Sequence, residues 1–126
     1  MTKLRDIYKC SVCGHVVEIA KEGAPTLVCC GEHMEKLEAK TQDEGKEKHV
    51  PVLEDTNGEV KVKVGSAEHP MIEEHYIKFI EVLTEKQVLR AELKPGEKPE
   101  AVFCVSKGDV TGVREYCTVH NLWKNS

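Results

Sequence analysis

The sequence predicts an all-β protein in which a small N-terminal metal module is followed by an antiparallel β-sandwich. Four of the six cysteines fall within the first 30 residues of this 126-residue chain. A polar stretch follows them, and the remainder consists of short apolar runs separated by turn signals, a pattern typical of sheet proteins. The length accommodates one domain or two small ones, and the uneven cysteine distribution favours two.

The composition is that of a globular protein, with 40% hydrophobic and 32% charged residues. A formal net charge of −4 gives no electrostatic reason to expect nucleic acid or an anionic membrane as a partner. No apolar run approaches the roughly 20 residues that cross a bilayer, and the opening "MTKLRDIYKC" lacks the apolar segment of a signal peptide. We therefore expect a cytoplasmic protein, in which cysteines serve as metal ligands before they serve as disulfides.

The N-terminal module, residues 1–37, contains two cysteine pairs with unequal spacing. In "YKCSVCG", Cys10 and Cys13 form a C-x-x-C turn that directs both sulfurs at one metal, and "LVCCG" adds Cys29 and Cys30. Neighbouring side chains on a strand face opposite ways, so the adjacent pair shares a metal only if the backbone bends. A module of this size needs more than a hydrophobic core to fold, and four thiolates around one ion supply it.

The identity of that ion is open at this point, because a tetrahedral set of four sulfurs suits both iron and zinc. A structural zinc site is a serious alternative. A redox dithiol in the C-x-x-C pair is a weaker one, because it leaves the second pair of cysteines unexplained. His15 and His33 lie in the same module, and we expect both to be exposed polar residues, since four sulfurs already saturate a tetrahedral ion.

A polar segment, residues 38–46, is assigned to a linker, and residues 47–126 to the second module. In "HVPVLEDTNGEVKVKVG", the dipeptide Asn57-Gly58 between two apolar runs is a strong hairpin signal. The second run alternates valine with charged residues, as a half-buried strand does. The second module therefore begins with a β-hairpin.

Three further runs predict short strands, at residues 87–93, 100–106 and 112–119. The segment 71–83, "MIEEHYIKFIEVL", fits a helical stripe as well as a strand. We favour a strand because its neighbours are strands, and an immunoglobulin-like antiparallel β-sandwich is then the simplest closure. Within 100–106 we expect Cys104 to be a buried small hydrophobic residue, and we interpret Trp123 as a core or site-wall residue.

The remaining histidines lie in the second module, each at the edge of a predicted segment. They are His49, His69, His75 and His120, and Cys117 precedes the last of them by three residues. Taken singly, each is an ordinary surface or hydrogen-bonded histidine. A cysteine and a histidine alone do not make a tight metal site, so any site here needs ligands from distant parts of the chain.

Taken together, these motifs resemble a known family. "YKCSVCG" with "LVCCG" is similar to desulforedoxin, and "EKHVP", "HPM", "HY" and "REYC..H" resemble the superoxide reductase domain of desulfoferrodoxin and neelaredoxin. In this order they span essentially the whole chain and resemble the two-iron desulfoferrodoxins. The resemblance implies a first iron bound by four cysteines: Cys10, Cys13, Cys29 and Cys30. It implies a second iron bound by four equatorial histidines and an axial cysteine: His49, His69, His75, His120 and Cys117.

The chemistry of the second set agrees with iron. Five protein ligands are more than zinc usually accepts and suit square-pyramidal ferrous iron with an open sixth position. An axial thiolate donates electron density to whatever binds opposite it. The reaction implied is the one-electron reduction of superoxide to hydrogen peroxide, after which an external donor such as rubredoxin re-reduces the iron.

The resemblance also assigns two residues beside His49. Lys48 would attract superoxide, a role that the net negative chain cannot fill through its total charge, and Glu47 would occupy the sixth position of the ferric iron. A homodimer is implied as well.

Two other functions stay open on the sequence alone. One is a non-catalytic iron protein that carries electrons or stores metal, and the other is a zinc-stabilised sandwich that serves as an interaction module. The absence of a sixth protein ligand favours an enzyme over an electron carrier, because a carrier gains by closing its coordination sphere. Metal analysis separates the zinc alternative.

Overall fold

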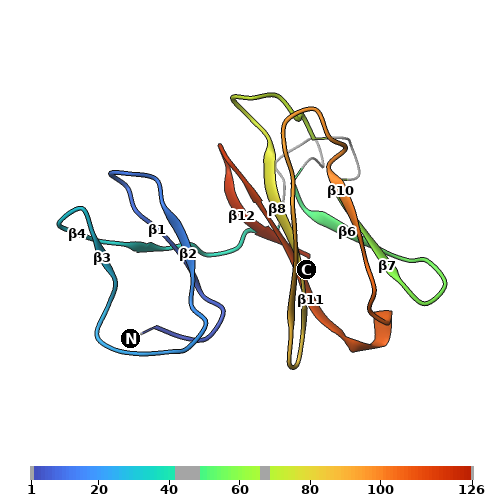
Figure 1. The fold of residues 1–126 in the computed structure, drawn as a ribbon, viewed down its shortest axis with the longest axis horizontal. Helices are drawn as coiled ribbons and strands as arrows, with labels where there is room; N and C mark the ends of the chain where they lie inside the picture. The colour runs from blue at the N-terminus through green and yellow to red at the C-terminus, as the bar shows by residue number, and fades with distance from the viewer. Residues whose placement is uncertain (1, 42–48, 66–68, 126) are drawn as a thin grey trace. The chain divides into compact units, whose positions relative to one another are not determined.

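A computed structural model describes residues 2–41, 49–65 and 69–125 of the chain (Figure 1). The chain divides into two compact units, Met1–Glu38 and Ala39–Ser126. Within the described ranges the regular structure is β-strand apart from one short 3₁₀ helix, so the all-β prediction is confirmed. These ranges contain no helix that is long and apolar enough to cross a membrane.

The first unit contains two small antiparallel sheets with strand orders β2-β1-β5 and β3-β4. The strands are β1 (Ile7–Lys9), β2 (Val16–Glu18), β3 (Val28–Cys29), β4 (Glu32–His33) and β5 (Glu35–Lys36). Its buried hydrophobic residues among those described are Ile7, Tyr8, Cys10, Ile19 and Leu37. One of these five is Cys10, a member of the cysteine set, so the place where a metal is expected lies at the edge of this small core, with Cys13 and Cys30 exposed.

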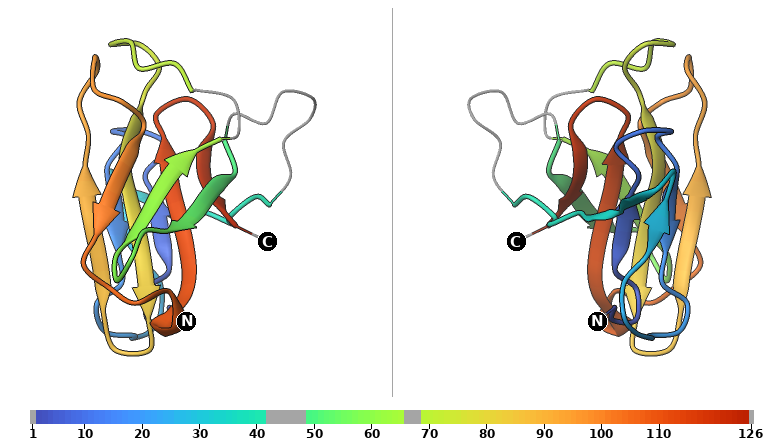
Figure 2. Two further views of the ribbon diagram at one scale, coloured as in Figure 1. Left: turned by 90° about the vertical axis from the view of Figure 1, so that its right-hand side faces the viewer. Right: turned by 90° about the vertical axis from the view of Figure 1, so that its left-hand side faces the viewer.

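The second unit is a sandwich of two antiparallel sheets, with strand orders β10-β7-β6 and β12-β11-β8-β9. Figure 2 shows the two layers from opposite sides. Its elements are β6 (Pro51–Asp55), β7 (Val60–Val64), β8 (Ile77–Thr84), β9 (Val88–Glu92), β10 (Glu100–Phe103), the 3₁₀ helix η1 (Lys107–Asp109), β11 (Val110–Cys117) and β12 (Asn121–Lys124). The core between the layers consists mainly of valine and isoleucine.

The predicted hairpin is confirmed in its pairing and its turn. Asn57 and Gly58 connect β6 to β7 with φ values of 59° and 95°, the left-handed pair that a two-residue turn of type I′ requires. Three valines of β7 face the core and are at most 1% exposed: Val60, Val62 and Val64.

From Ile77 onward the ambiguous segment forms strand β8, as predicted, whereas residues 71–76 lie outside the named strands. Strand β8 lies between β9 and β11 in its sheet, and Ile80, Glu81 and Val82 are buried in succession. A strand buried on both faces loses its two-residue alternation. This explains why the sequence pattern alone did not distinguish a strand from a helix there.

One expectation, the burial of Cys104, is corrected. Cys104 is exposed and lies just past the end of β10, where its thiol donates a hydrogen bond to Glu59 Oε2 at 3.3 Å. Phe103 takes the inward position instead, with 6% exposure, and alternation turns the next residue outward. Within the segment assigned above to the linker, Lys40 forms a parallel bridge with Trp123 beside β12 and lies in the second compact unit.

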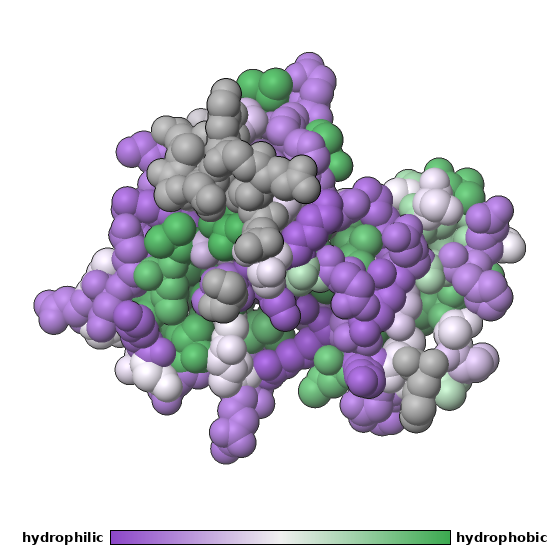
Figure 3. Space-filling model, turned by 180° about the vertical axis from the view of Figure 1, so that it is seen from behind, coloured by the Kyte–Doolittle hydropathy of each residue, from purple (hydrophilic) through white to green (hydrophobic). Residues whose placement is uncertain are grey.

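One face of the molecule is drawn in Figure 3, and it is mainly polar. Hydrophilic residues dominate the face drawn in Figure 3, and apolar residues appear there in separate groups. The large hydrophobic residues that are exposed are scattered along the described chain: Leu4, Val12, Val17, Val28, Val52, Ile72, Val102 and Val119. Single exposed apolar residues are ordinary on protein surfaces.

Candidate metal centres

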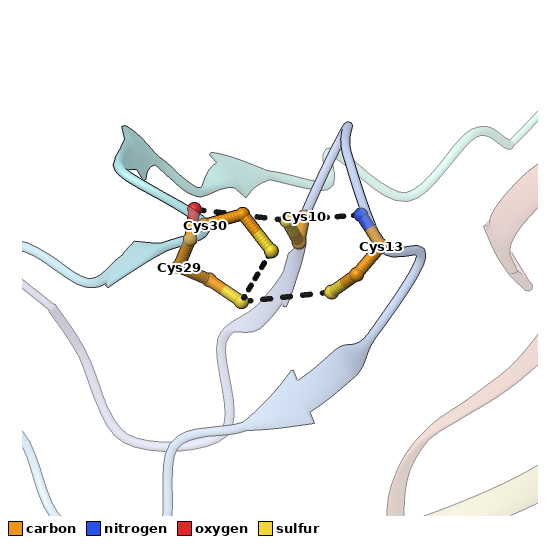
Figure 4. Close-up of side chains that lie close together, drawn as sticks. All are labelled: Cys10, Cys13, Cys29 and Cys30. Carbon is orange, nitrogen blue, oxygen red and sulfur yellow. Dashed lines mark hydrogen bonds between the residues drawn. The ribbon is translucent and has the colours of Figure 1, made fainter.

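Four cysteines converge in the first unit (Figure 4). Cys10 follows β1, Cys13 lies in the next turn, Cys29 ends β3, and Cys30 begins the turn to β4. Their four sulfur atoms all lie within 4.8 Å of one another. The sulfurs of Cys13 and Cys29 are 3.6 Å apart, and those of Cys29 and Cys30 are 3.8 Å apart.

The first pair is held by the turn that follows β1. Cys10 donates its backbone N–H to the His15 carbonyl at 2.9 Å and accepts from the N–H of Gly14 at 3.0 Å. Gly14 has a φ of 82°, a conformation that glycine adopts without the steric cost of a side chain. The backbone N–H of Cys13 then points at the Cys10 sulfur, 3.4 Å away.

The second pair meets the first because the backbone bends between its members. Cys30 and Gly31 have φ values of 52° and 74° and form the two-residue turn between β3 and β4, in which Cys29 pairs with Glu32. This is the bend that adjacent cysteines need if both are to reach one ion. The tight hairpin therefore brings the sulfurs of Cys29 and Cys30 to the same side, as a second C-x-x-C turn would.

The thiols of this cluster have opposed acidities. The backbone N–H of Cys13 lowers the pKa of Cys10 to about 6, whereas hydrogen bonding to the Cys13 sulfur raises the pKa of Cys29 to about 12. Hydrogen bonding to Cys13 also raises the pKa of Cys30. Crowded thiolates repel one another, so all of them lose their protons only when a cation lies among them. These residues fit a metal ion bound by four sulfurs.

The two histidines of this unit are exposed, as expected. His33 Nδ1 lies 3.1 Å from Thr26 Oγ1, and His15 Nδ1 lies 3.2 Å from the Cys13 sulfur.

A second cluster forms at one end of the sandwich. Strand pairing brings its segments together, because Pro51 at the start of β6 pairs with Val64 at the end of β7, and Ile77 at the start of β8 pairs with Cys117 at the end of β11. The predicted ligands lie on the chain immediately beside these ends. In Figure 2 the β11–β12 turn and the start of β6 are seen at the same end of the unit.

The four histidine rings form a closed cycle. Neighbouring rings have centroid distances of 4.6 to 5.0 Å and lie at 67° to 87° to each other, in the order His49, His69, His75, His120. The opposed pair His49 and His75 is 6.3 Å apart and more nearly parallel, at 24°. Cys117 contributes the sulfur, which lies 3.5 Å from His69 Nε2 and 3.9 Å from His120 Nδ1.

Four residues of this cluster each place one possible ligand atom within 4.8 Å of the ligand atoms of the other three: His49, His69, His75 and Cys117. His120 is outside this tightest group, although its ring completes the cycle. Cys117 is fully buried and His69 is 1% exposed, whereas His120 is exposed. The cluster therefore has a sulfur on its buried side and a histidine at the surface.

The protonation of His69 suits a metal ligand. Burial, followed by its histidine neighbours, lowers its pKa to about 4, so the ring is neutral at pH 7. Its Nδ1 lies 2.7 Å from the Pro70 carbonyl oxygen and must donate there, because a carbonyl only accepts. The Nε2 lone pair is thereby directed toward the cluster, an arrangement usual for metal-binding histidines. Burial also raises the pKa of the Cys117 thiol, and a bound cation would offset this.

The predicted residues Lys48 and Glu47 lie outside the described residues. The nine predicted ligands all lie in the two clusters, five in the second unit and four in the first. Donor sets of four sulfurs, and of imidazoles with one thiolate, are suited to transition-metal ions.

Comparisons with known proteins agree with this arrangement. A family profile described as desulfoferrodoxin matches residues 41–126, and that of the desulfoferrodoxin N-terminal domain matches residues 2–37. The chain belongs to the desulfoferrodoxin family. A desulfoferrodoxin homologue of Archaeoglobus fulgidus is 51% identical over 125 residues, which cover 99% of each chain. The two clusters match the pair of iron centres that the sequence resemblance implies for a desulfoferrodoxin.

Two other similarities differ in how much of this desulfoferrodoxin chain they cover. The desulforedoxin of Megalodesulfovibrio gigas is 61% identical over 31 residues, which are 25% of this chain and 84% of that protein. The superoxide reductase from Treponema pallidum superposes with a TM-score of 0.79 at 29% identity, covering 96% of this chain and 97% of that one.

Two residues near the second cluster extend the sequence analysis. Trp123 stacks on His49, with centroids 4.6 Å apart and an angle of 16°, so it is a site-wall residue. Lys40 donates a hydrogen bond from Nζ to the His120 carbonyl oxygen at 3.3 Å. A single bridged residue within a polar stretch has no periodic pattern, so the sequence offered no signal for Lys40.

Proposed function

We propose that this chain is a superoxide reductase, which reduces superoxide by one electron to hydrogen peroxide. The observation that carries the proposal is the cycle of four histidine rings with the Cys117 sulfur beside it, in a member of the desulfoferrodoxin family. When bound there, a ferrous ion supplies the electron that superoxide accepts, two protons complete the peroxide, and an external donor returns the electron.

The residues that would hold the second iron in this proposal are His49, His69, His75, His120 and Cys117. Cys117 lies at the buried end of β11, whereas His120 is exposed. This supports a thiolate on the buried side of the cluster and access for a small anion from the solvent side. A neutral His69, oriented by the Pro70 carbonyl, offers its lone pair without competition from a proton.

The first iron in this proposal is bound by Cys10, Cys13, Cys29 and Cys30. The external donor that re-reduces the second iron is a rubredoxin-type protein, and membership of the desulfoferrodoxin family supports this. We include a homodimer, which is supported by the small core of the first unit. A cytoplasmic location is supported by the five cysteines among the nine ligands, because their thiols must stay reduced.

The proposal keeps the division of the chain into residues 1–37, 38–46 and 47–126. The middle segment connects the two metal modules and also supplies Lys40 to the edge of the second sheet. Lys48 would attract the superoxide anion, and Glu47 would be available as a further ligand of the oxidised ion. The motif "EKH" supports these two roles.

Metal analysis combined with stopped-flow kinetics tests the proposal. The purified protein should contain two iron ions per chain, and its ferrous second centre should be oxidised rapidly by superoxide without release of dioxygen. A protein that holds both irons but does not react with superoxide is an electron carrier, and the proposal is then wrong. Zinc at both sites would refute it as well.

The role of Lys48 has a matched test. Lys48→Ile should slow the reaction with superoxide and weaken its dependence on ionic strength, because a steering charge is screened by salt. Lys46→Ile removes the same charge two residues away and is the control. Equal rates and equal salt slopes in the two variants would remove the steering role.

A further inference from the structure

The backbone carbonyl of His120 accepts two hydrogen bonds. Trp123 donates from its indole Nε1 at 3.0 Å, and Lys40 donates from Nζ at 3.3 Å. The turn that carries His120 also joins Cys117 to β12, so these two donors restrain the segment between two ligands of the second cluster.

Lys40 is held in place by its own backbone. Its N–H donates to the Leu122 carbonyl at 3.0 Å, and its carbonyl accepts from the N–H of Lys124 at 2.9 Å. These bonds add one residue to the edge of the four-stranded sheet, next to β12. The position of the ammonium group is therefore set by a paired backbone as well as by the side chain.

The side chain of Lys40 also contacts an aromatic ring that lines the cluster. Its Nζ lies 5.1 Å from the centroid of the Trp123 ring, within the range of a cation–π interaction. The same ring stacks on His49. Lys40 thus acts on two neighbouring members of the histidine cycle, on His120 through a hydrogen bond and on His49 through the indole.

The charge of Lys40 lies close to the cluster, because its Nζ is 3.3 Å from the carbonyl oxygen of His120 and 5.1 Å from the centroid of the ring that stacks on His49. A nearby positive charge disfavours the extra positive charge of a ferric ion relative to a ferrous one.

We propose that Lys40 is a positioning residue of the second metal centre, which restrains the His120 turn and Trp123 and raises the reduction potential of the bound iron. The inference rests on the proposed function only for the presence of iron in this cluster. A higher potential favours the ferrous ion, the form that reacts with superoxide.

Redox titration of the iron-loaded protein tests this with three variants. Lys40→Met removes the charge and the donor but keeps the stem, and Lys40→Arg keeps both. Lys107→Met removes an equal charge from η1, at the other end of β11, a strand of eight residues and about 23 Å in length.

At a fixed applied potential, Lys40→Met should raise the ferric-to-ferrous ratio of the second centre about threefold, the size expected for a charge that solvent partly screens. This lowers the midpoint potential by about 28 mV, since a tenfold change in a one-electron equilibrium is about 59 mV. Lys40→Arg and Lys107→Met should stay near wild type. Lys40→Gln, which keeps a donor without the charge, replaces Lys40→Met if the latter loses its iron, and a similar shift is expected.

A potential for Lys40→Met equal to that of Lys107→Met would overturn the inference. An equal shift in Lys40→Arg would also overturn it, because packing rather than charge would then be responsible. Failure of the wild-type protein to react with superoxide refutes the proposed function and leaves this comparison of potentials intact.

Discussion

Glu81 is a buried carboxylate at the centre of the four-stranded sheet, and its ion pairs yield a quantitative prediction. It is fully buried on β8, where Oε1 accepts from Arg114 Nε at 2.5 Å and Oε2 accepts from Arg90 Nε at 2.8 Å. The Arg114 side chain is 10% exposed and that of Arg90 is 39% exposed. The perturbation is Arg114→Met, which keeps most of the side-chain volume and removes the more buried cation.

The expected cost follows from what Glu81 retains. Removing one partner of a buried ion pair typically costs about 3–5 kcal/mol because a charge is left uncompensated. Here Arg90 remains, so the loss approaches that of one charge-assisted hydrogen bond, about 1.5–3 kcal/mol. We expect the free energy of unfolding to fall by about 2–3 kcal/mol in Arg114→Met, and by at most about 1 kcal/mol in Arg90→Met, whose charge is screened by solvent.

Urea unfolding of the metal-free protein, followed by circular dichroism at pH 7, measures both values. The double variant Glu81→Leu with Arg114→Leu should recover part of the loss, because replacing a buried ion pair by apolar residues is often neutral. If Arg114→Met cost no more than Arg90→Met, burial would not be what makes this pair important, and the reasoning would be refuted.

Three further predictions concern the two clusters. In the metal-free protein the pKa of His69 is lowered to about 4, so the unfolded chain binds a proton at a higher pH than the folded one. The contribution of His69 to the free energy of unfolding should therefore be complete above pH 6.5 and fall by about 3 kcal/mol as the pH drops toward 4. An unfolding series in which His69→Gln has the same pH slope as wild type would contradict this. Gly31→Ala should lower the free energy of unfolding by about 1–2 kcal/mol and reduce the iron content of the four-cysteine site, because φ is 74° at this residue. Gly23→Ala is the control, at a glycine with free space around it and no positive φ, and should change neither quantity. Cys104→Ser should leave the iron content unchanged, as metal analysis will show, because this thiol lies outside both clusters.

Local sequence signals predicted much of the fold. Asn57-Gly58 and the alternating valines of β7 specify a turn and a buried face within a few residues, so the hairpin was predictable. Strand β8 was harder, because burial on both faces removes the alternation. Cys104 was mistaken because the apolar run extends past the last paired residue of β10, and a sequence pattern does not show where pairing stops.

The candidate sites were predictable to different degrees. Cys10 and Cys13 have a spacing that specifies a common metal by itself. Cys29 and Cys30 required a bend, and the turn at Gly31 provides it. The histidines of the second cluster converge only through strand register, which spacing along the chain does not encode. For them the prediction depended on family resemblance.

The two ligand sets also differ in how much of the chain separates their members, and this bears on the order in which a nascent protein matures. All four sulfurs of the first centre have been synthesised by residue 30, so that centre is able to assemble while the sandwich strands are still being made. The second centre needs residues from 49 to 120 and the paired sheets that bring them together. We therefore expect metal to act early as a folding nucleus in the first unit, and to enter the second only as the last event, into a scaffold that is already folded.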